Sequence, residues 1–255
     1  MGRFFGLLYG GICYVITLFT LVYMFFFLTN VWVLKGVDDG EVIPIPQAVM
    51  INIGLILLFG LQHSIMARPG FKKIWTRVIP KTYERSTYVL ASSLVLAFVF
   101  WQWQPIQVWL WGTSSALGYS ILYGLFMLGT IIVLASTFMT DHFDLFGVRQ
   151  VWLNLWGRPY THQPFQARWF YRFMRHPLYF GLLLMLWSTP RMSYGHALFS
   201  LGMTMYILIG VRYEERDLAN ALGDDYRDYQ KQVPMLVPMP GKSYPGKSYS
   251  GPKPD

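Results

Sequence analysis

The longest stretch without a charged side chain most constrains how this chain can fold. From Ser86 to Thr140, 55 consecutive residues include no Asp, Glu, Lys or Arg. One membrane-spanning helix needs roughly 20 predominantly apolar residues, so a stretch of this length predicts two spans. Only 13% of the chain is charged, whereas average soluble domains carry about 25% charged residues. We therefore expect a membrane protein.

The distribution of apolar segments predicts an all-α fold, a polytopic transmembrane helical bundle. The first segment belongs to an uncharged run from Phe4 to Leu34, which is longer than the roughly 7–15 apolar residues of a signal peptide, so we expect a retained helix. The last two segments are short and meet at a turn-rich connection, 189–195, which indicates a helical hairpin. Because that hairpin could also be one broken helix, both five and six membrane helices remain open. The six segments are 4–29, 47–66, 87–104, 116–139, 177–189 and 195–211.

The lysines and arginines would be distributed unequally between the two sides of such a bundle. If every segment crosses, 19 of the 21 lie on one side, and only Lys35 and Arg191 lie on the other. The positive-inside rule makes the richer side cytoplasmic, with both termini there if six segments cross. This arrangement accounts for the net charge of +8, and no nucleic-acid-binding module is recognisable, so we expect no nucleic-acid partner.

Composition divides the chain at about residue 240. We expect residues 1–240 to form a single transmembrane domain with cytoplasmic loops. The tail 241–255 repeats GKSY among prolines and glycines, and such a segment cannot bury enough apolar surface to become ordered. The tail is therefore expected to be disordered. The sequence does not indicate an oligomeric state.

Four polar clusters lie at helix ends on the expected cytoplasmic side. Ionisable groups near the membrane usually mark a functional site, although interfacial Arg, Tyr and Trp can also serve only to anchor helices. The occurrence of four clusters on one side predicts a shared pocket. The clusters are LQHSIMARPGF (61–71), TDHFDLFGVRQ (140–150), RHPLYFG (175–181) and VRYEERDL (211–218).

The RHPLYFG cluster has the features of a helix N-terminus that binds an anion. Pro177 suits the first helical position, where its missing N–H has no intrahelical partner, so His176 lies at or beside the N-cap. Free N–H groups and the positive end of the helix dipole favour an anion, and Arg175 adds a full charge. Tyr179 lies on nearly the same face as His176. Gly181 would let a ligand or another backbone approach closely.

A carboxylate pair follows at the far end of the expected hairpin. An antiparallel hairpin returns Glu214 and Glu215 to the neighbourhood of Arg175 and His176. There the carboxylates could accept hydrogen bonds from ribose hydroxyls or an ammonium group. They could equally pair with arginines such as Arg175 or Arg212, in which case their role would be structural.

These residues resemble a known family of membrane enzymes. RHPLYFG, the following apolar helix, EE and GDDYRDYQKQVP (223–234) resemble the C-terminal motif of the isoprenylcysteine carboxyl methyltransferase superfamily, over residues 175–234. Two upstream stretches, QHSIMARPGFKKIWTRVIPKTYERSTYVL and DHFDLFGVRQ, are similar to a narrower branch, the bacterial membrane-bound methanethiol S-methyltransferases, which are related to the NnrU-like proteins.

The resemblance implies a methyl-donor site in the C-terminal region. In the superfamily this region binds S-adenosylmethionine, which implies that Arg175, His176, Tyr179 and the Glu214/Glu215 pair contact the donor. Pro177 and Gly181 complete the expected cofactor-binding set. A Rossmann-type donor site is not expected, because the chain has no G-x-G sequence. The resemblance also implies a bacterial inner-membrane protein whose active site faces the cytoplasm.

Methyl transfer to a small thiol would also require a base or a positive field. The thiolate is the nucleophile, and ordinary thiols are mostly protonated at neutral pH. Candidate bases are His142 and Asp144, two residues apart on an expected loop, and His63, which would line the acceptor cavity. Arg212 or Arg149 could stabilise the anion.

Metal-assisted chemistry is not expected. His63, His142, His162 and His176 could all face the cytoplasm, and imidazole is a common zinc ligand. The sequence nevertheless has no H-E-x-x-H motif and no short His pair. We therefore expect no metal site.

The sequence thus favours an integral membrane S-adenosylmethionine-dependent methyltransferase that converts methanethiol to dimethyl sulfide. An apolar thiol partitions into lipid, which gives a reason for a membrane enzyme. Two alternatives remain at this point. One is a methyltransferase of a lipid amine or a prenylcysteine carboxylate, and the other is a non-catalytic membrane carrier or sensor of a small anion.

Overall fold

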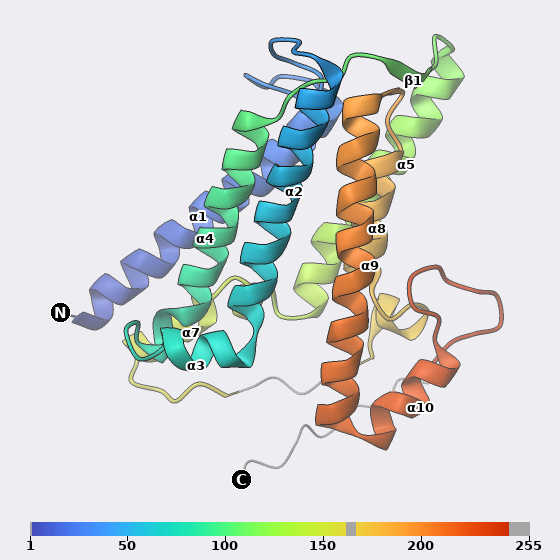
Figure 1. Ribbon diagram of the computed structural model, residues 1–255. Helices are drawn as coiled ribbons and strands as arrows, with labels where there is room; N and C mark the ends of the chain where they lie inside the picture. Colours follow the sequence, from blue (N-terminus) through green and yellow to red (C-terminus); the bar gives the residue numbers. More distant parts are fainter. Residues whose placement is uncertain (1, 162–166, 245–255) are drawn as a thin grey trace. The chain divides into compact units, whose positions relative to one another are not determined.

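The computed structural model describes residues 2–161 and 167–244, and most of these residues are helical. The predicted all-α polytopic fold is confirmed, and each of the six predicted apolar segments coincides largely with one helix (Figure 1). The six long helices are α1 (Gly2–Thr29), α2 (Ile45–Ala67), α4 (Lys81–Gln102), α5 (Ala116–Met139), α8 (Pro177–Trp187) and α9 (Tyr194–Leu222). The shorter ones are α3 (Pro69–Trp75), α6 (His142–Leu145), α7 (Val148–Leu155), the 3₁₀ helix η1 (Trp169–Arg172) and α10 (Asp224–Gln232).

Within the described part of the chain, four helices are long and apolar enough to cross a membrane: α1, α2, α5 and α9. The sequence analysis gives a different set of four. It counts the segment of α4 as a full-length span and the segment of α9 as a short one. Helix α4 is long enough, but it carries Ser86, Ser92 and Ser93, all of which are buried. Ser93 donates a hydrogen bond to Thr17 of α1. The lower hydropathy of α4 comes mainly from Lys81, Glu84 and Arg85 near its start and Gln102 at its end, and the buried serines add to it.

Helix α9 is much longer than the predicted segment 195–211. It continues through the polar residues 212–222 and ends before Gly223, whose φ of 64° lies in the left-handed region. No glycine or proline interrupts the polar part, so nothing in it breaks the helix. The apolar segment 195–211 therefore covers only the first part of this helix.

By its contacts the chain divides into two compact units. Unit 1 comprises residues 1–122, 142–160 and 189–203, and unit 2 comprises residues 123–141, 161–188 and 204–255. Helices α5 and α9 contribute residues to both units.

In unit 1, α4 packs between α1 and α2, and α7 packs against α1 (Figure 1). Glycines permit two of these close contacts, since a Cβ on Gly6 would lie 2.4 Å from the Tyr83 hydroxyl oxygen and one on Gly10 would lie 2.5 Å from Val151 Cγ2. The side chains of Phe27, Phe100 and Phe199 form part of the aromatic core.

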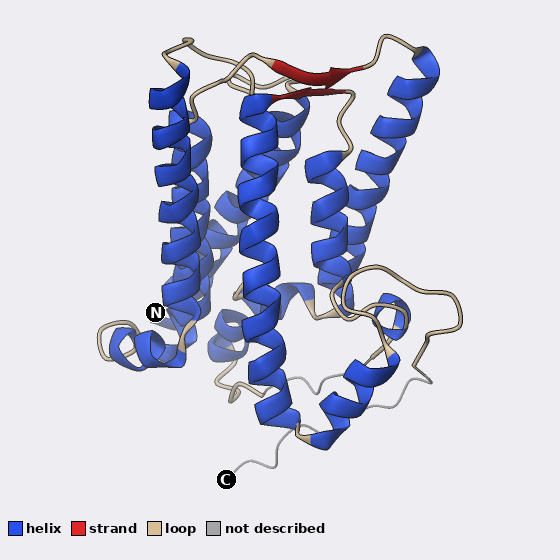
Figure 2. Ribbon diagram, turned by 45° about the vertical axis from the view of Figure 1, so that its right-hand side comes forward, coloured by secondary structure: helices blue, strands red, loops and turns tan. Residues whose placement is uncertain are grey.

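A two-stranded antiparallel ribbon in unit 1 is absent from the sequence prediction. Strand β1 (Trp109–Gly112) pairs with β2 (Arg191–Ser193), as Figure 2 shows. Next to the ribbon, buried Asp38 accepts hydrogen bonds from the Ser193 hydroxyl and the Asn30 amide. Burial raises the pKa of the Asp38 carboxyl. Strands of three and four residues are too short to produce a recognisable alternating pattern.

In unit 2, α8 and α9 form the predicted hairpin. Trp187, at the end of α8, donates a hydrogen bond to the Thr204 hydroxyl, whereas Tyr179, in the first turn of α8, bonds to Glu214. The end of α8 thus contacts the first half of α9, and the start of α8 contacts a later part of α9. The two helices are therefore antiparallel. On its other side α8 crosses α5, and there a Cβ on Gly181 would lie 2.7 Å from the Gly129 carbonyl oxygen.

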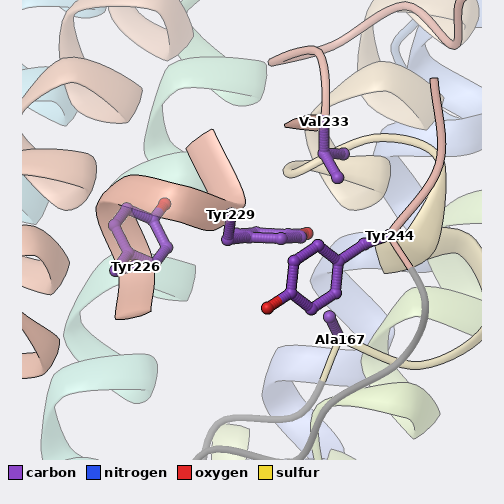
Figure 3. Packing of buried hydrophobic residues seen from close by; sticks show 5 residues of the cluster. All are labelled: Ala167, Tyr226, Tyr229, Val233 and Tyr244. Atoms are coloured by element: carbon purple, nitrogen blue, oxygen red, sulfur yellow. The ribbon is translucent and has the colours of Figure 1, made fainter. Parts of the chain in front are cut away.

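The C-terminal part of unit 2 has its own small core, shown in Figure 3. It consists of Ala167, Tyr226, Tyr229, Val233 and Tyr244, all of which are buried. Tyr244 belongs to the tail that the sequence predicted to be disordered, yet its ring packs edge-to-face on Tyr229. The rest of that predicted tail, residues 245–255, lies outside the described residues.

The crossing of α5 and α8 predicts a specific sensitivity to added methyl groups. Gly129→Ala and Gly181→Ala each place a Cβ against backbone atoms of the other helix, so we expect each to lower the free energy of unfolding by about 1–3 kcal/mol. Gly124→Ala, on the same helix as Gly129, is the control because its Cβ would meet nothing within 4 Å. Thermal unfolding in detergent measures the difference, and equal stability of Gly124→Ala and Gly129→Ala would contradict this packing.

Candidate functional site

A bidentate ion pair connects the start of α8 to α9. Arg175 Nε lies 2.5 Å from Glu215 Oε1, and Arg175 Nη2 lies 3.2 Å from Glu215 Oε2. Both side chains are largely buried, with exposed fractions of 12% and 14%. Two parallel hydrogen bonds between a guanidinium and a carboxylate fix direction as well as distance. The hairpin therefore brings these two predicted residues together as expected.

The remaining hydrogen bonds of Arg175 lead into the protein. Its Nη1 donates to the carbonyl oxygen of Gln230, at 3.0 Å, and to that of Val233. All three guanidinium nitrogens thus bind protein acceptors. We expected Arg175 to face an anionic ligand, and in the structure its charge has an internal partner in Glu215.

His176 occupies the N-cap position of α8, where the sequence placed it, but its side chain makes no capping hydrogen bond, and Pro177 occupies the first helical position. The imidazole is 5% exposed, and its Nε2 lies 3.0 Å from Glu215 Oε1. The backbone N–H of His176 donates to the Met235 carbonyl. Glu215 therefore binds both Arg175 and His176, and its carboxylate is engaged on both oxygens.

Glu214 differs from its neighbour in exposure and in partners. Its side chain is 46% exposed, and its Oε2 accepts a hydrogen bond of 3.0 Å from the Tyr179 hydroxyl. His176 Nδ1 lies 4.0 Å from the same oxygen. Glu214 is thus the more accessible carboxylate of the pair, beside the N-terminal turn of α8.

Gly181 has a packing role. The sequence left open whether a ligand or another backbone approaches it, and the backbone of α5 lies there at Gly129. The α5–α8 crossing is therefore sufficient to explain the glycine.

His142 lies in unit 1, on the four-residue helix α6 and not on the expected loop. The side chain is buried, and its Nε2 lies 2.7 Å from the Tyr14 hydroxyl of α1. The rings of Phe143 and Phe146 pack edge-to-face on the imidazole. A titratable ring surrounded by aromatic side chains is held in one orientation by its hydrogen bond.

Asp144 takes part in a different set of contacts. It forms an ion pair with Arg149, at 3.2 Å, and accepts hydrogen bonds from the Gln150 amide and from Tyr160, whose hydroxyl lies 3.1 Å away. Burial, with Asp144 nearby, raises the pKa of Tyr160 to about 12. Residues two apart on a helix point in different directions, which explains why the hydrogen bonds of His142 and Asp144 lead to different neighbours.

His63 also binds a tyrosine in unit 1. Its Nε2 lies 2.8 Å from the Tyr88 hydroxyl, and its Nδ1 lies 3.0 Å from the Ser92 hydroxyl, both on α4. Arg85 lies over the Tyr88 ring, with Cζ 5.2 Å from the ring centroid. Arg212, the fourth predicted catalytic residue, is exposed on α9 in unit 2, one turn before Glu215.

Sequence reasoning missed the tyrosines that bind the two histidines. Tyr14 and Tyr88 lie in predicted membrane helices, and the chain has 17 tyrosines in all. Each of these contacts joins residues far apart in the sequence, so no local pattern pairs them. The only available signal was a tyrosine hydroxyl inside an apolar helix. The contacts of Arg175 with the carbonyls at the end of α10 were missed for the same reason.

The described residues contain no group of three or more His, Cys, Asp or Glu side chains that could hold a metal ion. His162, one of the histidines considered from the sequence, lies outside the described residues.

Comparison with known proteins gives clear relatives. The chain is 48% identical to the methanethiol S-methyltransferase of Crocosphaera subtropica, over 95% of both chains. It is 46% identical to the methanethiol S-methyltransferase of Mycobacterium tuberculosis, over 94% of this chain and 98% of the relative. Nurim of Xenopus laevis is 31% identical over 66% of this chain and 62% of its own length.

The other two comparisons found nothing. No family model matches the chain, and no solved structure matches it. The full-length relatives are decisive, because identity near one half extends over almost the whole chain, including both the upstream clusters and the α8–α9 hairpin. This chain belongs to the methanethiol S-methyltransferase family of integral membrane proteins.

Proposed function

We propose that this protein is a membrane methyltransferase that transfers a methyl group from S-adenosylmethionine to methanethiol and forms dimethyl sulfide. The observation that carries the proposal is the identity of 48% over 95% of both chains with a methanethiol S-methyltransferase. The contacts in unit 2 support a donor site at the mouth of the α8–α9 hairpin.

The chemistry of the hairpin mouth fits this methyl donor. S-adenosylmethionine carries an ammonium group, ribose hydroxyls and a carboxylate, and when bound it supplies an electrophilic methyl group on a sulfonium. Glu214 is half-exposed, so it can accept a hydrogen bond from an ammonium or hydroxyl group. The N–H groups at the start of α8, after His176 and Pro177, suit a carboxylate. Tyr179 orients Glu214 through its hydroxyl.

In this proposal Arg175 and Glu215 hold the donor site without binding the donor directly. Their hydrogen bonds fix His176 and the first turn of α8 relative to Glu214. Pro177 begins that turn, and Gly181 lets α8 pack on α5. Positioning supplies much of the acceleration in a reaction that needs only an aligned nucleophile.

For the acceptor, we propose His142 as the base that removes the thiol proton. Its imidazole is held by Tyr14 and lies among aromatic rings, and the apolar surroundings suit an apolar thiol. Asp144, through Arg149 and Tyr160, would fix the segment that carries His142. His63 would line the acceptor side, and Arg212 would favour the thiolate electrostatically.

The placement in the cell follows from the charges. Nineteen of the 21 lysines and arginines fall on one side if six segments cross, so we propose a bacterial inner-membrane protein whose active site and termini face the cytoplasm. Residues 1–240 would act as one methyltransferase domain.

The experiment that tests the proposal uses purified protein with donor labelled on the methyl group. Three acceptors are offered separately: methanethiol, phosphatidylethanolamine and a prenylcysteine. Labelled dimethyl sulfide from methanethiol alone is expected. Transfer to phosphatidylethanolamine or to the prenylcysteine in place of methanethiol would overturn the proposed acceptor, and donor binding without any product would indicate a carrier.

The two adjacent glutamates are predicted to respond differently to neutralisation. Glu214→Gln removes the accessible charge and should weaken donor binding by about tenfold, the value of one hydrogen bond to a charged group, with little change in thermal stability. Glu215→Gln leaves Arg175 without its buried partner, so it should lower the unfolding temperature as well. Equilibrium binding of labelled donor and thermal unfolding in detergent separate the two effects. Equal donor affinity in Glu214→Gln and the wild type would exclude Glu214 as a donor ligand.

Residues proposed for the acceptor side are predicted to change turnover and leave donor affinity intact. His142→Ala should lower kcat by about 100- to 10,000-fold, the usual contribution of a general base, and Asp144→Ala should lower kcat less. Tyr14→Phe keeps the ring and removes the hydrogen bond to His142. Its kcat should therefore lie between that of the wild type and that of His142→Ala. Single-turnover rates with saturating donor measure these effects, and a normal rate in His142→Ala would rule out the imidazole as the base.

A further inference from the structure

The segment that follows α10 returns to the donor side of unit 2. We call residues 233–244 the C-terminal strap. Its carbonyls at Pro234 and Met235 accept hydrogen bonds from the backbone N–H groups of Arg175 and His176, at 3.0 and 3.1 Å. Both residues belong to the proposed donor site. The strap thus binds the two residues that immediately precede α8.

The other end of the strap is attached to the same stretch of chain. The Tyr244 N–H donates to the Arg172 carbonyl at 2.9 Å, and Arg172 Nε donates to the Tyr244 carbonyl at 3.0 Å. Hydrogen bonds at residues 172, 175 and 176 therefore hold the strap along the whole approach to the helix. Arg175 adds a side-chain bond to the Val233 carbonyl.

Tyr244 anchors the strap in the core drawn in Figure 3. Its ring is buried and lies edge-to-face on Tyr229, with centroids 5.3 Å apart. Tyr229 in turn donates a hydrogen bond from its hydroxyl to the Tyr171 carbonyl. Burial of an aromatic ring contributes more than any single hydrogen bond here, so Tyr244 supplies the main attachment at this end.

From this arrangement we propose that Tyr244 is a positioning residue for methyl-donor binding, acting through the strap on Arg175 and His176. The inference rests on the proposed donor site. When Tyr244 holds the strap, the backbone of 172–176 has fixed partners, and the first turn of α8 begins in one orientation. Without that attachment, the chain before α8 gains freedom that donor binding must then remove.

The test compares full-length Tyr244→Ala, Tyr244→Leu and Tyr244→Phe with the wild type. Tyr244→Phe keeps the ring and the backbone bonds to Arg172, whereas Tyr244→Ala removes the ring. Val237→Ala is the matched control, because Val237 lies on the strap with its side chain exposed. Tyr244→Leu keeps an apolar side chain and provides a milder variant if Tyr244→Ala does not fold.

Two measurements are made on each folded variant. Hydrogen exchange of the peptide that contains residues 172–176 measures directly how firmly the strap is bound to this segment, and it requires no methyl donor. In Tyr244→Ala we expect this exchange to be faster and the donor KM to rise about tenfold with kcat nearly unchanged, since a small misplacement costs this much or more. Tyr244→Leu should be intermediate, Tyr244→Phe, which keeps the ring, should lie closer to the wild type than Tyr244→Leu does, and Val237→Ala should match the wild type in both.

The outcomes separate this inference from the proposed function. If Tyr244→Ala and Tyr244→Leu leave both the exchange and the donor KM unchanged, or raise the exchange alone, the positioning role is wrong. A fall in kcat with unchanged KM would also overturn it. If wild-type protein does not bind labelled S-adenosylmethionine, or Glu214→Gln binds it normally, the proposed donor site fails instead, whatever the exchange data show.

Discussion

The ion pair between Arg175 and Glu215 is the interaction on which the rest of the hairpin mouth depends. It joins Arg175, two residues before α8, to the polar part of α9, and through two carbonyls it also reaches the end of α10. Both charges are largely buried, so each needs the other, because an unpaired buried charge is strongly destabilising. His176 and the Val233 end of the C-terminal strap contact this pair directly.

Two adjacent carboxylates acquire different roles in this setting. Successive helical residues point about 100° apart, so Glu215 faces α8 and α10 while Glu214 remains half-exposed beside Tyr179. One side chain is used to hold the site, and the other stays accessible to a ligand. In the proposed donor site, Glu215 would supply support and Glu214 recognition from neighbouring positions of one helix.

Two histidines of unit 1 are held in the same way. His63 and His142 each bind a tyrosine hydroxyl from another helix, and such bonds hold a titratable ring in one orientation within an apolar bundle. The sequence suggested that His142 would act with Asp144 because they are close along the chain. The short helix α6 turns them apart, and Asp144 binds Arg149 and Tyr160.

What the sequence by itself determined is the membrane bundle and the meeting of RHPLYFG with EE. Hydropathy over about twenty residues and the preference of Pro177 for the first helical position are local properties, so they can be read without a structure. The tertiary structure decided the internal use of Arg175, the packing role of Gly181 and the burial of Tyr244 in a segment expected to be a disordered tail. Each of these depends on a partner far away in the chain, and no local pattern specifies which distant backbone a side chain will meet.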